Sequence, residues 1–250
     1  MIRRWSLLLV LFAVALQARA GEVTVAVASN FTAPMKEIAA AFERESGHRV
    51  KLVFGSSGKF YAQIRNGAPF QVFFSADRAK PRTLDADGLA VPGSRFTYAV
   101  GSLALWSPQA GRVRDGAALL QSGDFGKLAL ANPRLAPYGT AALEVLRSLH
   151  LQAATRSHWV QGENIAQTFQ FVASGNADLG FVALSQIQHG GRIERGSAWI
   201  VPASLYQPIR QDAVLLPAGA DSAAARSLLR FVRGKHAAAI IESYGYRAGR

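Results

Sequence analysis

The sequence predicts an α/β fold in which mostly parallel sheets are flanked by helices. Short apolar runs rich in Val, Leu and Phe alternate along the chain with segments whose apolar residues recur every three or four positions. The runs at 72–74 and 179–184 are apolar almost throughout, as is typical of strands buried on both faces. Half of the 250 residues are hydrophobic, which is enough for a large core. Such an alternation of strands and helices favours layered sheets and helices.

The first third of the chain contains three strand-and-helix pairs. Thr32 can cap the first helix, Pro34 suits its first turn, and Gly47 ends it. The predicted strands are 23–27, 50–54 and 72–74, and the predicted helices are 32–47, 57–66 and 80–87.

The remainder of the chain continues the same alternation. A long extended segment is predicted at 96–106, and two helices are predicted at the end of the chain. The further predicted strands are 128–131, 179–184, 199–201 and 213–216, and the helices are 139–150, 165–174, 222–233 and 236–244.

Residues 1–20 are predicted to be a secretory signal peptide. Arg3 and Arg4 precede an apolar stretch at 7–16, and the small residues of Ala-Arg-Ala at 18–20 suit a cleavage site. The apolar stretch is short for a membrane span, and no second one follows. We therefore expect a soluble, exported mature protein that begins near Gly21.

Charge and cysteine content exclude several classes of function. Removal of the signal peptide lowers the formal net charge from +12 to +9, and the basic residues are scattered rather than grouped. This pattern favours a solvated basic surface over a nucleic-acid partner. The chain has no cysteine, which excludes a disulfide framework, a thiol nucleophile, a cysteine metal site and a lipidated N-terminal cysteine.

Four loops follow predicted strands, and each introduces a helix. Ligands of open α/β sheets bind beyond the carboxyl ends of the strands, where the first N–H groups of a helix are unpaired. Neutral donors at such places suit a small oxyanion. The loops are Ser29-Asn30, Ser56-Ser57, Pro137-Tyr138-Gly139 and Glu163-Asn164-Ile165.

These loops, in their order and spacing, resemble the periplasmic molybdate-binding proteins of ABC importers, the ModA family. The resemblance covers residues 23–244. Its motifs are Val-Ala-Ser-Asn at 27–30, Gly-Ser-Ser-Gly at 55–58, Gly-Ala-Pro at 67–69, Phe-Ser-Ala-Asp at 74–77, Ala-Pro-Tyr-Gly at 136–139, Gly-Glu-Asn-Ile at 162–165 and Leu-Gly-Phe-Val-Ala at 179–183.

The resemblance implies a two-lobed periplasmic binding protein fold of type II. Lobe one would hold residues 21–100 plus 202–250, and lobe two would hold residues 101–201. It also implies a monomeric periplasmic receptor that carries molybdate, and tungstate with it, to an ABC permease of the inner membrane. The oxyanion would be cargo, so neither a reaction nor a cofactor is expected.

The family's ligand residues can be carried over to matching positions. Ser29 and Ser57 match hydroxyl donors of lobe one, whereas Tyr138 and Ile165 match residues of lobe two that give backbone N–H groups. One position departs from the pattern, because Ala183 stands where many members have a tyrosine whose hydroxyl completes the site. The resemblance makes Asn30 the expected substitute, through its side-chain amide.

The expected site consists of donors only. A fully deprotonated tetrahedral dianion has four acceptor oxygens, and helix starts add partial positive charge without a counter-ion. A protonated anion such as phosphate would leave its own O–H unsatisfied, at a cost of about 1–3 kcal/mol. The preference among molybdate, tungstate and sulfate stays open.

The residues also bear on several other functions. The main alternative is a sulfate-type receptor. A secreted serine hydrolase lacks the G-x-S-x-G motif, and the five histidines form no zinc motif. A cytoplasmic regulator conflicts with the signal peptide. Lys59 is expected to face solvent. Gly58-Lys59 does not form a nucleotide-binding P-loop, because Val53 and Phe60 break that pattern. Asp77 is expected to cap the next helix. No cation site is expected.

Overall fold

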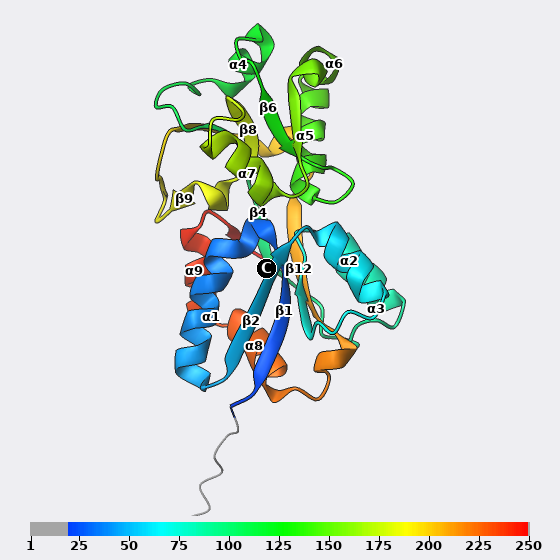
Figure 1. Cartoon of the computed structure of the whole chain (residues 1–250). Helices are drawn as coiled ribbons and strands as arrows, with labels where there is room; N and C mark the ends of the chain where they lie inside the picture. The colour runs from blue at the N-terminus through cyan, green and yellow to red at the C-terminus, as the bar shows by residue number, and fades with distance from the viewer. Residues whose placement is uncertain (1–19, 250) are drawn as a thin grey trace, which may run out of the picture.

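The structure is a computed structural model that describes residues 20–249. The predicted signal peptide lies outside the described residues except for Ala20. Two α/β lobes follow one another along the long axis of the molecule (Figure 1). No helix in residues 20–249 has the length and apolar character needed to cross a membrane.

Lobe one is built on a six-stranded sheet with the order β13-β4-β12-β3-β1-β2. Its strands are β1 (Glu22–Ala28), β2 (Arg49–Gly55), β3 (Val72–Phe74), β4 (Phe96–Gly101), β12 (Ile209–Leu215) and β13 (Arg247–Ala248). Its helices are η1 (Ser29–Phe31), α1 (Thr32–Ser46), α2 (Ser57–Arg65), α3 (Ala79–Ala86), η5 (Pro217–Gly219), α8 (Ala223–Val232) and α9 (Lys235–Ser243).

Lobe two is built on a five-stranded sheet with the order β11-β5-β8-β6-β7. Its strands are β5 (Leu103–Ser107), β6 (Leu128–Ala131), β7 (Trp159–Gly162), β8 (Leu179–Ala183) and β11 (Ser197–Ile200), and β9 (Gln188–His189) pairs with β10 (Arg192–Ile193) as a separate hairpin. Its helices are α4 (Gly116–Ser122), α5 (Pro137–Ser148), α6 (Gln152–Thr155), η2 (Arg156–His158), α7 (Ile165–Ala173) and η3 (Leu184–Gln186), and η4 (Ala203–Leu205) lies on the connection back to lobe one.

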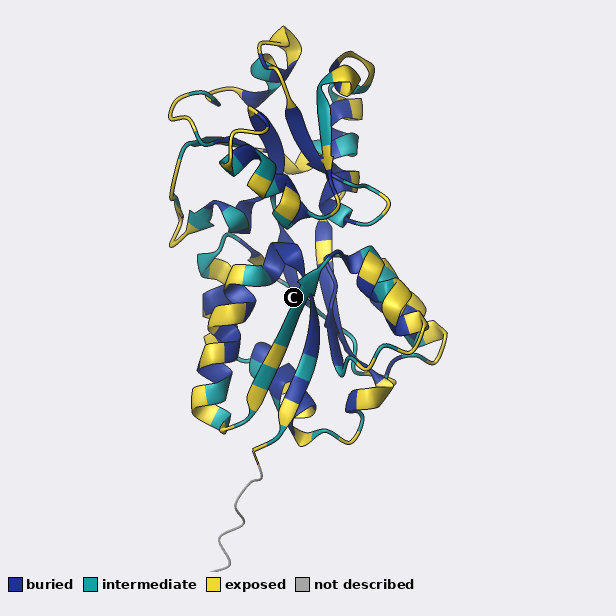
Figure 2. Ribbon diagram, viewed as in Figure 1, coloured by how far each residue is buried: buried dark blue, intermediate teal, exposed yellow. Residues whose placement is uncertain are grey.

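Each sheet has a hydrophobic core on both of its faces. In β1, Val23, Val25 and Val27 pack into the core beneath α1, α8 and α9, whereas Ala26 faces a second core with Phe60 of α2. The central strands of both sheets are accordingly buried, whereas the edge strands β2, β7 and β11 are partly exposed. The other exposed residues concentrate on the outer sides of the helices and on the loops (Figure 2). The two-sided burial explains why the central strands are apolar runs.

Both sheets are mixed, which corrects the expectation of mostly parallel sheets. Strand β1 is parallel to β2 and β3, and β6 is parallel to β7 and β8. In contrast, β12 is antiparallel to β3 and β4, and β5 is antiparallel to β8 and β11. The antiparallel strands are those next to the crossings, because the chain leaves lobe one through β4 and returns through β12 in the opposite direction.

The predicted extended segment 96–106 is two strands in different sheets. Strand β4 ends at Gly101 in lobe one, and β5 begins at Leu103 in lobe two, so the chain crosses between the lobes at Ser102. A side chain at Gly101 would collide with the hydroxyl of Tyr138 and the amide of Gln211. The first crossing therefore needs glycine because two buried polar side chains pack against it.

Candidate functional site

The five residues expected to bind an anion line one small cavity between the lobes. Its volume is about 180 Å³, a figure that includes space open to solvent. Loops that follow β1, β2 and β3 of lobe one meet the first turns of α5 and α7 of lobe two there. No charged side chain is among the described residues that line it, which are Ala28, Ser29, Asn30, Gly55, Ser56, Ser57, Ala76, Ala136, Pro137, Tyr138 and Ile165.

The hydroxyl of Ser57 is oriented to donate. Ser57 is buried, and its Oγ accepts the backbone N–H of Ala76 at 2.9 Å. A hydroxyl has one hydrogen to give, and that of Ser57 has no acceptor among residues 20–249. The Oγ of Ser29 donates to Oδ1 of Asn164 over a long 3.3 Å, so that hydroxyl forms a bond between the lobes.

The first turn of α2 leaves one backbone N–H group without a partner. The N–H of Gly58 donates to the carbonyl of Leu135 in lobe two at 2.9 Å, and the N–H of Lys59 donates to Oγ of Ser56, the N-cap residue, at 3.3 Å. The first N–H groups of a helix have no acceptor within it. Ser57 N–H is therefore unpaired within the described chain, and Ser57 lines the cavity.

The first turn of α7 repeats this arrangement in lobe two. Oδ1 of Asn164, the N-cap residue, accepts the N–H groups of Ala166 and Gln167, both at 3.0 Å. The N–H of Ile165 then has no acceptor in residues 20–249.

The first turn of helix α5 also leaves one backbone N–H without a partner. Pro137 at its first position has no N–H to satisfy, and the N–H of Gly139 donates to the carbonyl of Ala136 at 2.9 Å. Tyr138 N–H is left without an acceptor within the described part of the chain. Three helices from both lobes therefore each present one free N–H at a cavity-lining residue.

Comparisons with known proteins agree with this architecture. The family model of bacterial extracellular solute-binding proteins matches residues 23–247. The molybdate-binding protein ModA of Azotobacter vinelandii is 55% identical over 92% of this chain and 91% of that relative, and ModA of Rhodobacter capsulatus is 51% identical over 93% and 90%. The chain belongs to the ModA family of solute-binding proteins. The solved structure of a periplasmic molybdate-binding protein from Azotobacter vinelandii superposes with a TM-score of 0.88 at 42% identity, covering 91% of this chain and all of that one.

Family membership confirms two of the expectations from the sequence. The fold is that of a two-lobed periplasmic binding protein, and ModA-type solute-binding proteins are transport components rather than enzymes. The hydrolase alternative is thereby removed.

In this ModA-family chain the side chain of Asn30 has a different role from the one expected. Its Nδ2 donates to Oε1 of Gln211 at 2.8 Å and to the hydroxyl of Tyr246 at 2.9 Å. An amide group has two hydrogens, so neither is left for a ligand. Asn30 still lines the cavity, and its backbone N–H, next to the start of η1, has no acceptor in residues 20–249. The backbone rather than the side chain is thus the available donor.

A buried polar network behind the cavity was missed by the sequence analysis. It comprises Asn30, Tyr98, Tyr138, Ser185, Gln211 and Tyr246, all of which are buried. Burial raises the pKa values of Tyr98 and Tyr138 well above their ordinary value, and it raises the pKa of Tyr246 to about 12. The three phenols are therefore neutral at physiological pH. Ala183, the departure from the family pattern, is fully buried in β8 and does not line the cavity.

The charged residues lie at the rim and not in the cavity. Nζ of Lys59 is 2.6 Å from Oε2 of Glu163 in lobe two, and both side chains are about half exposed. Asp77 lies one residue before Arg78, the N-cap residue of α3, and its Oδ1 accepts the N–H of Lys80 in the first turn at 2.9 Å, which is the capping interaction that was predicted. No cluster of three or more His, Asp or Glu side chains suited to a metal ion occurs within residues 20–249.

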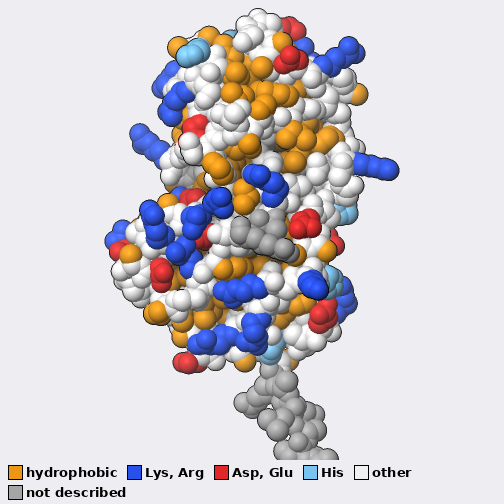
Figure 3. Space-filling view, turned by 180° about the vertical axis from the view of Figure 1, so that it is seen from behind, with side chains coloured by type: hydrophobic (Ala, Val, Ile, Leu, Met, Phe, Trp, Pro, Cys, Tyr) orange, Lys and Arg blue, Asp and Glu red, His pale blue; other side chains and the backbone are white. Residues whose placement is uncertain are grey.

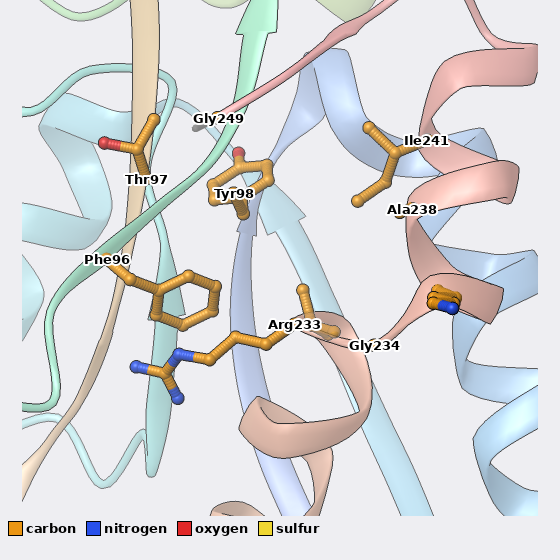
Figure 4. A pocket seen from close by; sticks show the side chains of 10 residues that line it. Phe96, Thr97, Tyr98, Arg233, Gly234, Ala238, Ile241 and Gly249 are labelled. Carbon is orange, nitrogen blue, oxygen red and sulfur yellow. The ribbon is translucent and has the colours of Figure 1, made fainter.

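A second hollow lies on lobe one, between β4 and the α8–α9 turn. Figure 4 shows the guanidinium of Arg233 beneath the ring of Phe96, 3.7 Å from the ring centroid. That guanidinium also donates to the carbonyl of Ser94 at 2.9 Å, so its role there is in packing. Lys and Arg side chains are otherwise spread over the back of both lobes among apolar patches (Figure 3).

Proposed function

We propose that this protein is a periplasmic receptor that captures molybdate between its lobes and delivers it to an ABC importer. The observation that carries the proposal is the set of unpaired donors at one cavity: the hydroxyl of Ser57 and the backbone N–H groups of Asn30, Ser57, Tyr138 and Ile165. Relatives that are 55% and 51% identical are named molybdate-binding proteins, which supports the same cargo here.

The chemistry of the donors favours a fully deprotonated tetrahedral oxyanion. Each N–H and O–H can point at an oxygen, and the starts of α2, α5 and α7 add partial positive charge. A protonated phosphate would need an acceptor that the donors do not offer, at a cost of about 1–3 kcal/mol. Tungstate has the same shape and charge as molybdate, so it is included in the proposal. The hydroxyl of Ser29 joins the donors if it turns from Asn164 towards the anion.

The remaining parts of the proposal concern location and partners. The predicted signal peptide supports export to the periplasm, with cleavage after Ala20. We propose a monomer that closes around its cargo and docks in that form on a permease of the inner membrane, without a cofactor. Hinge closure around a ligand is the usual motion of periplasmic binding proteins.

Calorimetric titration of the mature chain, residues 21–250, tests the proposal. We expect molybdate and tungstate to bind tightly at one site, and phosphate to leave no measurable heat of binding. Sulfate is the informative competitor, because it shares the charge of molybdate but is smaller. Sulfate binding that is tighter than molybdate binding would favour the sulfate-receptor alternative, and the absence of binding for all four anions would contradict the proposal.

A further inference from the structure

Gln211 occupies the middle of β12, the strand through which the chain returns to lobe one. Its side chain is fully buried, and so is that of the next residue, Asp212. The side chains of two successive residues in a regular strand point to opposite faces of the sheet. Between Gln211 and Asp212 the register of β12 against β4 also shifts, so the strand is irregular at this point. Asp212 pairs with Arg95 at 2.7 Å, whereas Gln211 reaches the polar network at the cavity.

The amide of Gln211 joins the two lobes directly behind the cavity. Its Oε1 accepts hydrogen bonds from Nδ2 of Asn30 at 2.8 Å and from the hydroxyl of Tyr98 at 2.9 Å. Its Nε2 donates to the hydroxyl of Tyr138 at 3.1 Å. Asn30 belongs to lobe one and Tyr138 to lobe two, and both line the cavity. One side chain therefore contacts a donor residue from each half.

Tyr246 holds Asn30 from the other side. Its hydroxyl lies 2.9 Å from both the carbonyl oxygen and Nδ2 of Asn30, and 2.9 Å from Oγ of Ser185 in lobe two. Ser185 also donates to the carbonyl of Asn30, at 2.8 Å. Both ends of Asn30 are thus fixed by neighbours, which leaves its peptide group little freedom to rotate.

We propose that Gln211 is a positioning residue for the oxyanion, with Tyr246 as its partner: they fix Asn30 and Tyr138 so that the backbone N–H groups of both point into the cavity when the lobes close. This inference rests on the proposed function, because it names the residues that aim the donors of that site. Neither Gln211 nor Tyr246 lines the cavity.

Gln211→Glu tests the proposal without changing the size of the side chain. A carboxylate still accepts from Asn30 and Tyr98, but it cannot donate to Tyr138, and it places a negative charge beside the dianion. Burial and a neighbouring anion both raise the pKa of a carboxyl group. The protonated form regains the missing donor and loses the charge, so molybdate binding by the variant should improve as the pH falls.

We expect Gln211→Glu to bind molybdate about tenfold or more weakly at pH 8, and this difference to shrink about threefold or more by pH 6. Binding to the variant should also take up a proton, which is detected by titration in two buffers of different ionisation enthalpy. Gln71→Glu is the matched control, because Oε1 of Gln71 only accepts a bond from the N–H of Thr24 within lobe one. It should bind like the parent at both pH values.

Tyr246→Phe provides a second, independent variant. It keeps the ring and removes only the hydroxyl, and we expect molybdate to bind about threefold to tenfold more weakly. Tyr244→Phe is its control, because the hydroxyl of Tyr244 donates to Glu37 at 3.0 Å at the surface. Thermal unfolding of each variant shows whether it folds, and if Gln211→Glu does not, Tyr246→Phe decides alone.

The proposal is overturned if Gln211→Glu is folded and binds molybdate within threefold of the parent at both pH values. It is also overturned if Tyr246→Phe binds no more weakly than Tyr244→Phe. The parent protein distinguishes this from failure of the function itself: a parent that binds none of the oxyanions contradicts the proposed function, whereas a parent that binds molybdate while both variants match it contradicts only the role of Gln211 and Tyr246.

Discussion

The two lobes contribute to the cavity in different ways. Lobe one presents the hydroxyl of Ser57 in addition to backbone groups, whereas lobe two presents only the backbone N–H groups of Tyr138 and Ile165. The side chains of those two residues serve other purposes, since Ile165 packs in the core of lobe two and Tyr138 joins the polar network. Side-chain substitutions should therefore reveal the binding role of lobe one but conceal that of lobe two.

The largest effect is expected from a substitution that removes a backbone donor of lobe two. Ile165→Pro deletes the N–H at the first position of α7, where proline is well tolerated. The preceding residue, Asn164, is already extended at φ −142° and ψ 173°, as a residue before proline prefers. Loss of a bond to a charged acceptor costs about 1.5–3 kcal/mol, and the ring adds crowding, so we expect molybdate to bind about 150-fold or more weakly in calorimetry.

Ile165→Val is the control for this variant. It keeps the N–H and most of the packing, and we expect molybdate affinity within about threefold of the parent. Equal losses in the two variants would mean that lobe two binds through side-chain packing, and the contrast between the lobes would disappear.

Ser57→Ala tests the contribution of lobe one. We expect molybdate binding to weaken by roughly 10- to 150-fold, because a bond to a charged acceptor is lost. The variant should also unfold more easily, by about 1–3 kcal/mol, since the buried N–H of Ala76 loses its acceptor. Calorimetry and urea unfolding measure the two effects.

Ser222→Ala separates the loss of binding from the loss of a helix cap. Oγ of Ser222, the N-cap residue of α8, accepts the N–H of Ala225, so this variant loses an N-cap worth about 1 kcal/mol of stability at a residue that does not line the cavity. Its molybdate affinity should stay close to that of the parent. A change below threefold for Ser57→Ala would count against Ser57 as a ligand.

The polar network shared by the lobes predicts a loss of stability at high pH. Tyrosines of the unfolded chain ionise near pH 10, whereas burial raises the pKa of Tyr246 to about 12 in the folded protein. Between these values the unfolded state releases a proton that the folded state keeps, so the free energy of unfolding falls as the pH rises. The loss for Tyr246 alone approaches about 2 kcal/mol near pH 12.

Urea unfolding at a series of pH values from 9 to 11.5 measures this loss. Stability should be flat below about pH 10 as far as these groups are concerned. Tyr246→Phe should lose stability less steeply than the parent above that pH, and identical slopes would show that the Tyr246 hydroxyl is not held neutral by burial.

The smallest effect is expected at the charged rim. The Lys59–Glu163 ion pair joins the lobes but is half exposed, and such pairs contribute about 0–1 kcal/mol. Lys59→Met should therefore change molybdate affinity by about fivefold at most, and less at high salt because exposed charges are screened. A much larger loss would mean that the cargo is held by charge as well as by neutral donors.

The sequence predicted the structure best where a few neighbouring residues determine it. A polar loop after an apolar strand and before a helix is a local pattern, and the four such loops do meet at one cavity. The capping role of Asp77 is equally local and is confirmed. The ligand roles of Ser29, Asn30, Ser57, Tyr138 and Ile165 stay predictions.

Contacts that depend on the closed arrangement of distant segments could not be predicted. Asn30 meets Gln211 and Tyr246 across 181 and 216 residues, and nothing near Asn30 in the sequence indicates that its amide is already used. Lys59 faces solvent as expected, but its ion pair with Glu163 of the other lobe could not be predicted. The mixture of parallel and antiparallel strands likewise follows from how the chain crosses between the lobes. The apolar run of a single strand does not indicate the direction of its neighbours in the sheet.

The contact between Gly58 and Leu135 limits the size of the side chain that the interface between the closed lobes can hold at position 58. A β-carbon at position 58 would stand 2.9 Å from the α-carbon and 3.0 Å from the carbonyl oxygen of Leu135. Even alanine would therefore require the two lobes to move apart at this contact. A hydrogen atom on the α-carbon of residue 58 is thus the largest substituent that fits against Leu135 without a shift. Gly58→Ala is therefore expected to give a variant of this protein whose lobes cannot close completely.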